Sequence, residues 1–421
     1  MTPGEDAVRQ LRRASGCADP IRLRGWLERI DPTTGEILAR VVTAREPTGA
    51  LLVPCGDRRT ANCPSCAETY RRDAFQLVAS GLRGGKGVPK SVASHPVVMA
   101  TLTAPSFGLV HTIRDRGGGC PCGRRHSSDD EVLGTPVDPT TYRYEEQAAW
   151  NHLAPTLWKR TAQAIRRKLA RELGVPRDRL SELLRVRFVM ASEFQRRGVV
   201  HYHVVIRIDG PGDAGSEPPS RCTAEMFERV VRSVVSDVEL PAPPVRSREC
   251  PIRWGRQAEI VGLDLSGVGR AAGYIAKYAT KATEGVAGGT LIPRVRTRRE
   301  VASMRLPPHA RRLVEAAWRA GETRGLEGAQ RWAHQFGYGG HTLTKSRDYS
   351  VTFAVLRATR AAWRAGRPTI SWTSAIARGT LVFAGRGYAN PAADWLAREC
   401  WSNGAKRSPR NQSGERHGGS T

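Results

Sequence analysis

The sequence predicts an α+β fold in which a central antiparallel sheet is flanked by helices. Two β-prone runs, residues 185–195 and 199–208, are separated only by Arg-Arg-Gly at 196–198, which is typical of a hairpin. A third β-prone run covers residues 97–103. Residues 150–173 carry apolar side chains at helical spacing and basic side chains on the opposite face. This pattern indicates an amphipathic helix that packs on a sheet.

The remaining elements are expected on both sides of these. They are a helix near residues 6–13, two strands joined by a turn at 31–36, a cysteine-bearing stretch at 55–73, a long loop at 113–140, a helix at 223–237, a strand at 252–263, a helix at 268–283, a basic helix at 311–320 and strands at 342–353 and 380–383. We expect five segments: a lead-in with a hairpin (1–54), a zinc-binding segment (55–93), a catalytic core (94–285), a basic DNA-binding region (286–400) and a disordered tail (401–421).

The composition points to a polyanionic partner. The formal net charge is +26, and only 8 of the 66 basic residues are lysines. Arginine binds phosphates and guanine with two hydrogen bonds, so nucleic acid is the favoured partner. The alternative is a GC-rich genome, which inflates the number of arginine codons. Because neither a membrane span nor a signal peptide is visible, we expect a cytoplasmic protein with no membrane partner and with its nine cysteines reduced.

His201 and His203 lie two residues apart in a β-prone run, so both side chains project from the same face of the strand. Two imidazoles on one face can hold a divalent cation, for which we expect Mg²⁺ or Mn²⁺. Glu193 is the candidate third ligand. A three-residue turn with Gly198 in the left-handed conformation would pair Glu193 with His201, whereas a two-residue turn would point it away. The alternative is a chance pair of histidines on a half-buried strand.

Tyr274 and Tyr278 are spaced to share one face of a helix, and Lys277 and Lys281 follow on an adjacent line. A phenol is a weak nucleophile at neutral pH, but a nearby ammonium group favours its phenolate. Such a helix can attack a DNA phosphodiester and form a covalent phosphotyrosine link. The alternative is an ordinary amphipathic helix whose tyrosines are core and whose lysines are exposed.

Three cysteines at Cys55, Cys63 and Cys66 have spacing typical of a zinc site that lacks one ligand. The long loop offers Cys120, Cys122 and His126 to complete it, so one structural zinc is expected to hold the loop to the core. The sequence leaves open whether the chain holds one zinc ion or two. The histidines expected to be structural or surface residues, and not ligands, are His95, His111, His152 and His309.

Several segments together resemble the HUH endonucleases, in which two histidines flank a hydrophobic residue. The closer resemblance is to the replication initiators of actinomycete rolling-circle plasmids and integrative elements. The matching segments follow the family order and are residues 16–23, 55–59, 63–66, 101–108, 193–203, 274–281 and 340–347. The resemblance implies an HUH-endonuclease core, with His201 and His203 as metal ligands and Tyr278 as the nucleophile. Many plasmid initiators carry Glu where this chain has Tyr274, and paired tyrosines also occur in phage gene A initiators.

The resemblance further implies nicking of one strand at a plasmid double-strand origin, with a 5′-phosphotyrosyl protein and a free 3′-OH primer as products. Its implied partners are origin DNA, both duplex and single-stranded, and the host helicase and polymerase. Candidate DNA contacts are Arg196, Arg197, Lys345 and Arg347. The alternatives are an HUH transposase or relaxase with the same chemistry, or a zinc-containing DNA-binding regulator without catalysis.

Overall fold

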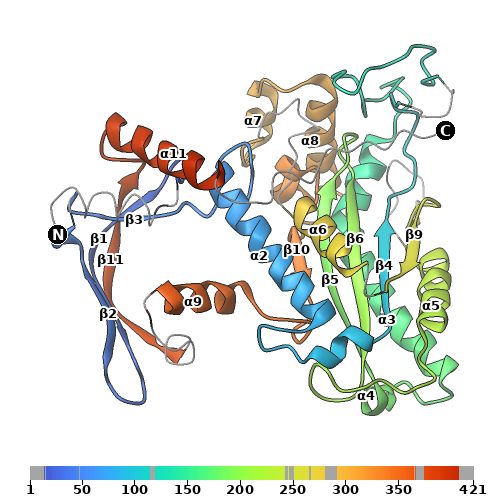
Figure 1. Cartoon of the computed structure of the whole chain (residues 1–421). Coiled ribbons are helices and arrows are strands. Elements are labelled where there is room, and N and C mark those ends of the chain that lie inside the picture. Colours follow the sequence, from blue (N-terminus) through green and yellow to red (C-terminus); the bar gives the residue numbers. More distant parts are fainter. Residues whose placement is uncertain are drawn as a thin grey trace, which may run out of the picture. The chain divides into compact units, whose positions relative to one another are not determined.

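The computed structural model describes residues 14, 16–46, 48–113, 119–241, 245, 251–264, 267–279, 292–364, 366 and 374–406 (Figure 1). The expected helix near residues 6–13 lies outside these ranges, as does most of the expected tail. The chain forms two compact units, one from residues 1–73 and 352–421 and the other from residues 74–351. In the described part of the chain, no helix is both long and apolar enough to cross a bilayer.

The first unit is built on a small antiparallel sheet. Strand β1 (Ile21–Ile30) pairs with β2 (Ile37–Val42), β3 (Leu51–Val53) and β11 (Ile376–Arg386). The predicted turn at 31–36 is confirmed: the Asp31 carboxylate accepts a hydrogen bond from the Thr33 N–H, and the Asp31 carbonyl accepts one from Gly35. The helices of this unit are α9 (Phe353–Arg364), α11 (Pro391–Lys406) and the first half of α2 (Pro64–Arg83).

The second unit contains a five-stranded antiparallel sheet in the order β10-β5-β6-β4-β9 (Figure 1). Its strands are β4 (Val97–Leu102), β5 (Arg185–Phe194), β6 (Val200–Asp209), β9 (Glu259–Gly262) and β10 (Leu343–Lys345), and a separate pair is formed by β7 (Glu239–Leu240) and β8 (Ile252–Arg253). The predicted central antiparallel sheet is therefore confirmed, and β6, which carries both histidines, is its middle strand.

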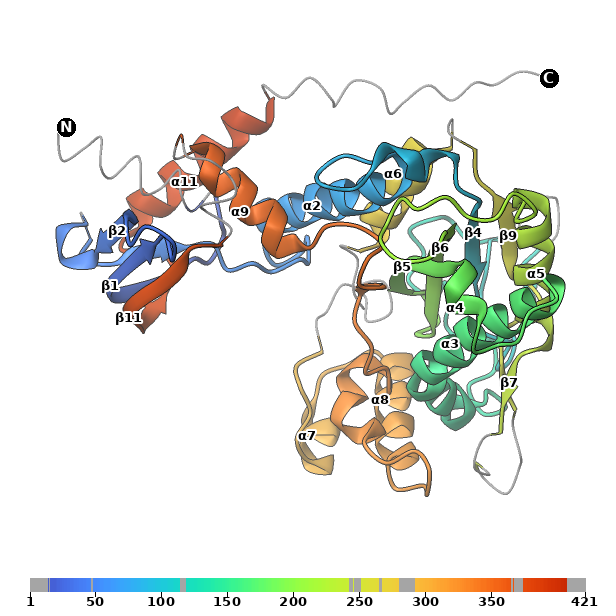
Figure 2. The same cartoon turned by 90° about the horizontal axis from the view of Figure 1, so that it is seen from below.

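Helices cover both faces of this sheet (Figure 2). On one face, α3 (Tyr144–Glu172) and α5 (Ala224–Asp237) share a core with alternate residues of β6, among them Tyr202 and Val204. On the other face, α6 (Val268–Tyr278) contacts β5 and β6. The remaining helical segments are α4 (Leu180–Leu183), α7 (Arg298–Ser303), α8 (Pro308–Ala320) and the 3₁₀ turns Thr43–Arg45, Lys90–Ser94 and Ala329–Gln335.

Three element predictions were wrong in their bounds. Helix α3 begins at Tyr144, because Glu145 and Glu146, which interrupt the apolar pattern, are buried with Arg319 and Arg143 as partners. The expected strand at 252–263 is two strands, because Gly255 packs against the Ala104 backbone between them. The expected strand at 342–353 ends at Lys345, and α9 begins at Phe353.

Candidate active site

The turn between β5 and β6 decides whether Glu193 faces His201. Gly198 has φ 78°. The Gln195 N–H donates to the Val199 carbonyl, and the Gly198 N–H donates to the Gln195 carbonyl. These bonds close a three-residue turn, and the ladder pairs Glu193 directly with His201. The predicted register is confirmed.

His201 and His203 project together from β6 with ring centroids 4.5 Å apart, and both are buried. Neither ring nitrogen of His203 has a hydrogen-bond partner among the described residues. The Glu193 carboxylate lies 3.5 Å from its Nε2, which is beyond a good hydrogen bond. Nδ1 of His201 lies 3.3 Å from the side-chain amide nitrogen of Gln195. Buried nitrogens without partners beside a carboxylate are the donor set that suits a cation.

The electrostatics favour a ligating form of His201. Burial lowers the pKa of His201 to about 4, and the neighbouring His203 and Arg197 act in the same direction, while Glu193 opposes them. His201 is therefore neutral at physiological pH, and a neutral imidazole is the form that binds metals. The ligand atoms of His201, His203 and Glu193 do not all lie within 4.8 Å of one another, as those of two other groups of described residues do.

Two tyrosines of α6 contact His203 from the open side of the sheet. The Tyr278 ring stacks on the His203 ring with centroids 4.2 Å apart and planes at 24°. Tyr274 meets the same imidazole edge-on at 4.8 Å, and the two phenol rings lie 4.5 Å apart. Nζ of Lys277 is 5.9 Å from the centre of the Tyr278 ring. Lys281 lies outside the described residues.

Acidic side chains lie near Tyr274. Burial raises the pKa of Tyr274, and a hydrogen bond with Tyr278 and the charges of Glu193 and Glu259 act in the same direction. Glu259 begins β9, and Thr101 of β4 pairs with Glu259 on one side and with His203 on the other. A second carboxylate thus stands in line with the histidines across the sheet, so the site faces acidic groups from both β5 and β9.

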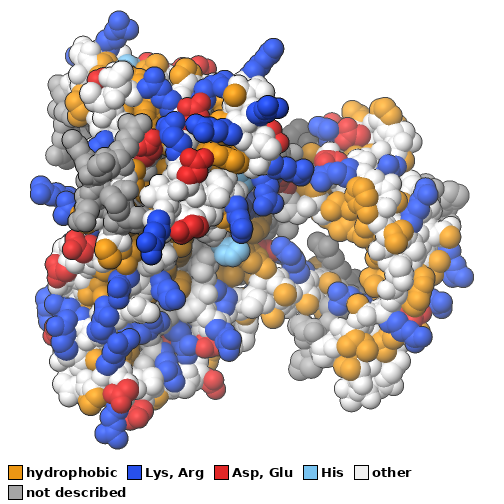
Figure 3. All heavy atoms as spheres, turned by 180° about the vertical axis from the view of Figure 1, so that it is seen from behind, with side chains coloured by type: hydrophobic (Ala, Val, Ile, Leu, Met, Phe, Trp, Pro, Cys, Tyr) orange, Lys and Arg blue, Asp and Glu red, His pale blue; other side chains and the backbone are white. Residues whose placement is uncertain are grey.

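A basic cleft of about 1450 Å³ adjoins this site in the second unit. It is lined by Gln195, which contacts His201, and by the exposed Arg196, Arg253 and Arg256. Lys and Arg side chains are also widespread on the face shown in Figure 3. The cleft meets the histidine site only through Gln195, because neither His201 nor His203 lines it.

The other predicted DNA contacts differ in how available their side chains are. Arg197 also lines the cleft, but its guanidinium donates to the carbonyls of Ala104 and Pro105 and to the Gln195 side chain. Lys345 donates to the Arg347 carbonyl at 2.7 Å, and the Arg347 side chain is exposed. Arg347 is therefore more accessible to a phosphate than Arg197.

Four cysteines of the first unit form a closed group that could hold a metal ion: Cys17, Cys55, Cys63 and Cys66. The sulfur separations are 3.7 Å for Cys55 to Cys66 and 3.8 Å for Cys17 to Cys63. A tetrahedral zinc site with Zn–S bonds of about 2.3 Å has edges of about 3.8 Å between sulfurs. A hydrogen bond from Cys66 lowers the pKa of Cys17, which favours the thiolate form that binds metals.

The expectation that the long loop completes this group was wrong. Cys17 is the fourth member, because the pairing of Ile21 with Val53 brings the two strand ends together, and the Cys55 N–H donates to the Cys17 sulfur. The loop residues expected to complete it form a second group with His111. That group, which could also hold a metal ion, is His111, Cys120, Cys122 and His126. His111, expected to be a structural or surface residue, thus lies with the loop cysteines in a group that has four members.

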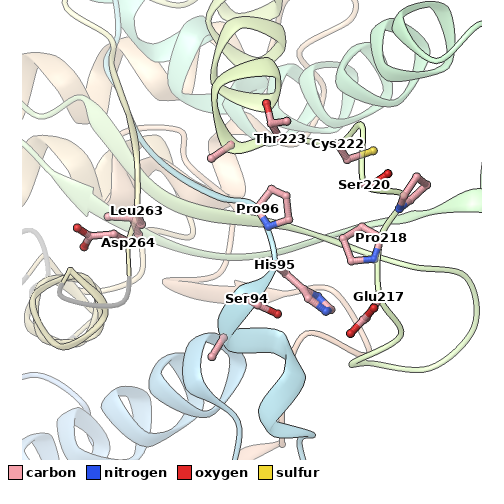
Figure 4. Close-up of a pocket in the computed structure, with 13 residues that line it drawn as sticks. Ser94, His95, Pro96, Glu217, Pro218, Ser220, Cys222, Thr223, Leu263 and Asp264 are labelled. Atoms are coloured by element: carbon pink, nitrogen blue, oxygen red, sulfur yellow. The ribbon is translucent and has the colours of Figure 1, made fainter.

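His95 and His309 are structural, as expected. Nδ1 of His95 lies 2.8 Å from the buried Asp209 carboxylate, at the opposite end of β6 from His201. His95 lines a pocket of about 740 Å³ beside Glu217 (Figure 4). His309 lies 3.1 Å from the Arg197 carbonyl through its Nε2.

Comparison with known proteins identifies the family. The family model described as RepSA, replication initiator protein of pSAM2, matches residues 4–402. The chain belongs to this family. A replication initiator protein of Streptomyces ambofaciens is 41% identical over 373 residues, which cover 85% of this chain and 80% of that protein. No solved structure matches the chain.

Sequence reasoning missed several residues of these sites. Cys17 was hidden by its distance of 38 positions from Cys55, although it stands in one of the segments that carry the resemblance. His111 precedes Cys120 by nine positions, and this spacing was a usable signal. Glu259 and Gln195 gave no signal, because only the strand register brings them to the histidines.

Proposed function

We propose that the chain starts rolling-circle replication by nicking one strand of a plasmid double-strand origin, with Tyr278 as the nucleophile on an HUH-type core. The observation that carries this proposal is the stacking of Tyr278 on His203 at 4.2 Å, with Tyr274 on the same imidazole. A phenol, a paired phenol and two histidines thus converge on one open face of the sheet. Membership of a replication initiator family supplies the biological context.

The reaction is a transesterification that consumes no water. The Tyr278 hydroxyl oxygen forms a bond to phosphorus, and the bond between phosphorus and the 3′ oxygen breaks. The phenol proton ends on the departing oxygen, which gives a free 3′-OH, and the 5′ phosphate stays on the tyrosine. The Lys277 ammonium lies 5.9 Å from the centre of the Tyr278 ring and would attract the phosphodiester to it. The 3′-OH primes leading-strand synthesis by the host polymerase, behind the host helicase.

His201, His203 and Glu193 would hold a divalent cation, Mg²⁺ or Mn²⁺. The partnerless buried nitrogens of His203 and the neutral ring of His201 fit this role. When bound, such a cation polarises a phosphodiester oxygen and stabilises charge in the transition state. Gln195 orients His201, and Tyr274, placed beside Tyr278, supplies a second nucleophile for the closing transfer.

The basic cleft would carry single-stranded origin DNA to the tyrosines. Arg253 and Arg256, which are exposed, are candidate phosphate contacts in the cleft, as is Arg196, whose guanidinium also donates to the Ser128 carbonyl. Arg347 is a further candidate phosphate contact, together with Lys345. Duplex origin recognition is assigned to the basic region after residue 286.

The four-cysteine group would hold a structural zinc ion. Its sulfur separations fit a zinc tetrahedron, and none of the four cysteines is in a disulfide. Cys17→Ser should remove about one zinc per chain, as measured by elemental analysis. Because three thiolates and a hydroxyl bind zinc more weakly, we also expect the first unit to lose resistance to proteolysis.

The test of the nicking proposal uses an oligonucleotide that carries the cognate origin. Wild-type protein with Mn²⁺ should give a protein–DNA adduct that survives SDS, and mass spectrometry should map the DNA to Tyr278. Tyr278→Phe should abolish the adduct, and Tyr70→Phe, a matched change far from the histidines in sequence, should leave it intact. Tyr274→Phe should keep the first nick and lose the second transfer.

Each alternative gives a different outcome. An adduct that maps elsewhere, or full adduct formation by Tyr278→Phe, would remove the nucleophile assignment. Specific DNA binding with no adduct would support the non-catalytic regulator. The same adduct without replication of a plasmid bearing the origin would support a transposase or relaxase.

A further inference from the structure

The loop between β4 and α3 contains a group of four ligand side chains outside the nicking site. Nδ1 of His111 lies 3.3 Å from Nε2 of His126 and 3.7 Å from the Cys120 sulfur. The Cys122 sulfur lies 3.3 Å from the same Nε2. A zinc tetrahedron has edges of about 3.3 Å between two nitrogens and about 3.6 Å between nitrogen and sulfur, so the separations agree to about 0.3 Å.

The outer partner of His126 supports a metal at its inner nitrogen. Nδ1 of His126 lies 2.7 Å from the Asp130 carboxylate. An ionised carboxylate only accepts hydrogen bonds, so Nδ1 donates to Asp130, and Nε2 is the ring nitrogen left to bind a metal ion. A carboxylate behind a histidine is the usual arrangement at zinc sites. Nε2 also lies 3.3 Å from both Nδ1 of His111 and the Cys122 sulfur, so one cation between these atoms would bind all three.

This group is tied to the turn that carries the nicking site. The backbone of His111 exchanges hydrogen bonds with Gly134 and Thr135. Gly134 packs on the β5–β6 turn so closely that an added methyl group would lie 2.5 Å from Cβ of Arg196 and 2.9 Å from the Arg197 nitrogen. Arg196 also donates to the Ser128 carbonyl at 2.9 Å. The loop therefore covers the turn on its outer side.

The β5–β6 turn is linked to His201 through Gln195. The Arg197 guanidinium donates to the Gln195 side chain at 3.0 Å, and the Gln195 amide nitrogen lies 3.3 Å from Nδ1 of His201. A continuous set of contacts thus runs from the four-residue group through Gly134, the turn and Gln195 to the histidine.

We propose that His111, Cys120, Cys122 and His126 form a second zinc site that fixes the β5–β6 turn and so positions His201. Two thiolates and two imidazoles are a donor set that selects zinc over Mg²⁺ or Mn²⁺. A closed four-ligand site has no position for substrate, so its role is to hold the loop. The effect on nicking rests on the proposed function, whereas the zinc site and the ordering of the turn do not.

The first test counts metal in the full chain. Wild-type protein should contain two zinc ions per chain, and Cys122→Ser should contain one. Asp130→Asn keeps all four ligands and should weaken retention of that zinc by tenfold or more against a chelator. Cys222→Ser changes a buried cysteine outside both groups and should keep two. One zinc in wild-type protein, unchanged in Cys122→Ser, would overturn the site.

The second test measures hydrogen exchange of the backbone amides at residues 195–200, which needs neither DNA nor a catalytic metal. In Cys122→Ser these amides should exchange at least tenfold faster, while the amides of β11 should not change. Unchanged exchange at 195–200 in a variant that has lost one zinc would overturn the positioning role. If both tests succeed but wild-type protein forms no DNA adduct, the proposed nicking function fails and the zinc site stands.

Discussion

Asn151 of α3 holds the start of the histidine strand, and its removal should cost stability. Its side-chain amide donates to the carbonyls of Gly198 and Phe336, and its oxygen accepts from the Val200 N–H, each at 3.0 Å. Asn151 is fully buried. Asn151→Ala leaves three backbone groups without their partner, at about 1–3 kcal/mol each. A water molecule entering the polar cavity would recover part of this, so we expect a loss of about 3–5 kcal/mol.

Urea unfolding followed by tryptophan fluorescence measures this loss, because Trp150 and Trp158 report on the same core. Thr156→Ala, an exposed position on α3, is the matched control and should change the free energy of unfolding by less than about 0.5 kcal/mol. The variant should also nick origin DNA more slowly, because the turn before His201 loses its support. A loss below about 1 kcal/mol for Asn151→Ala would show that these bonds do not hold the turn.

The other predictions concern acid stability, backbone conformation and DNA binding. Burial lowers the pKa of His309 to about 4, so below about pH 6.5 the unfolded chain binds a proton that the folded chain does not. The free energy of unfolding should therefore fall by up to about 3 kcal/mol by pH 4. In urea titrations, His309→Gln should flatten this decline. Gly198→Ala should lower the free energy of unfolding by about 1–2 kcal/mol, because φ of Gly198 is 78°. Gly273→Ala should raise it by about 0.5–1 kcal/mol, because Gly273 lies in a helix with open space around it. A lower free energy of unfolding in both variants would contradict the conformational argument. Arg256→Ala should reduce the salt dependence of single-strand binding by about 0.7 in log–log slope, and an unchanged slope would exclude Arg256 from phosphate contact.

The sequence predicted what local rules determine. Alternation along a strand placed His201 and His203 on one face, and Gly198 marked the turn that pairs Glu193 with His201. Helical spacing placed Tyr274 and Tyr278 on one face of α6. In each case the controlling residues lie within about ten positions of one another, where backbone geometry leaves few choices.

Pairings between distant segments escaped prediction. The partner of β1 is β11, and no short pattern links residues 21–30 to residues 376–386. The same pairing problem hid Cys17, which reaches Cys55 only through the β1–β3 ladder. The stretch after Lys345 was predicted to be a strand, but its apolar content suits a strand and the start of a helix equally. Apolar content alone does not distinguish the two.

The β1–β11 ladder also constrains the order in which the polypeptide can mature on the ribosome. About 350 residues separate the two strands, which at ordinary elongation rates is tens of seconds of synthesis. Residues 74–351, which include the histidines and tyrosines, are translated before the β1–β11 ladder can close. Nascent chains truncated before β11 should therefore leave one edge of β1 uncovered and open to aggregation, even where the histidines and tyrosines are already assembled.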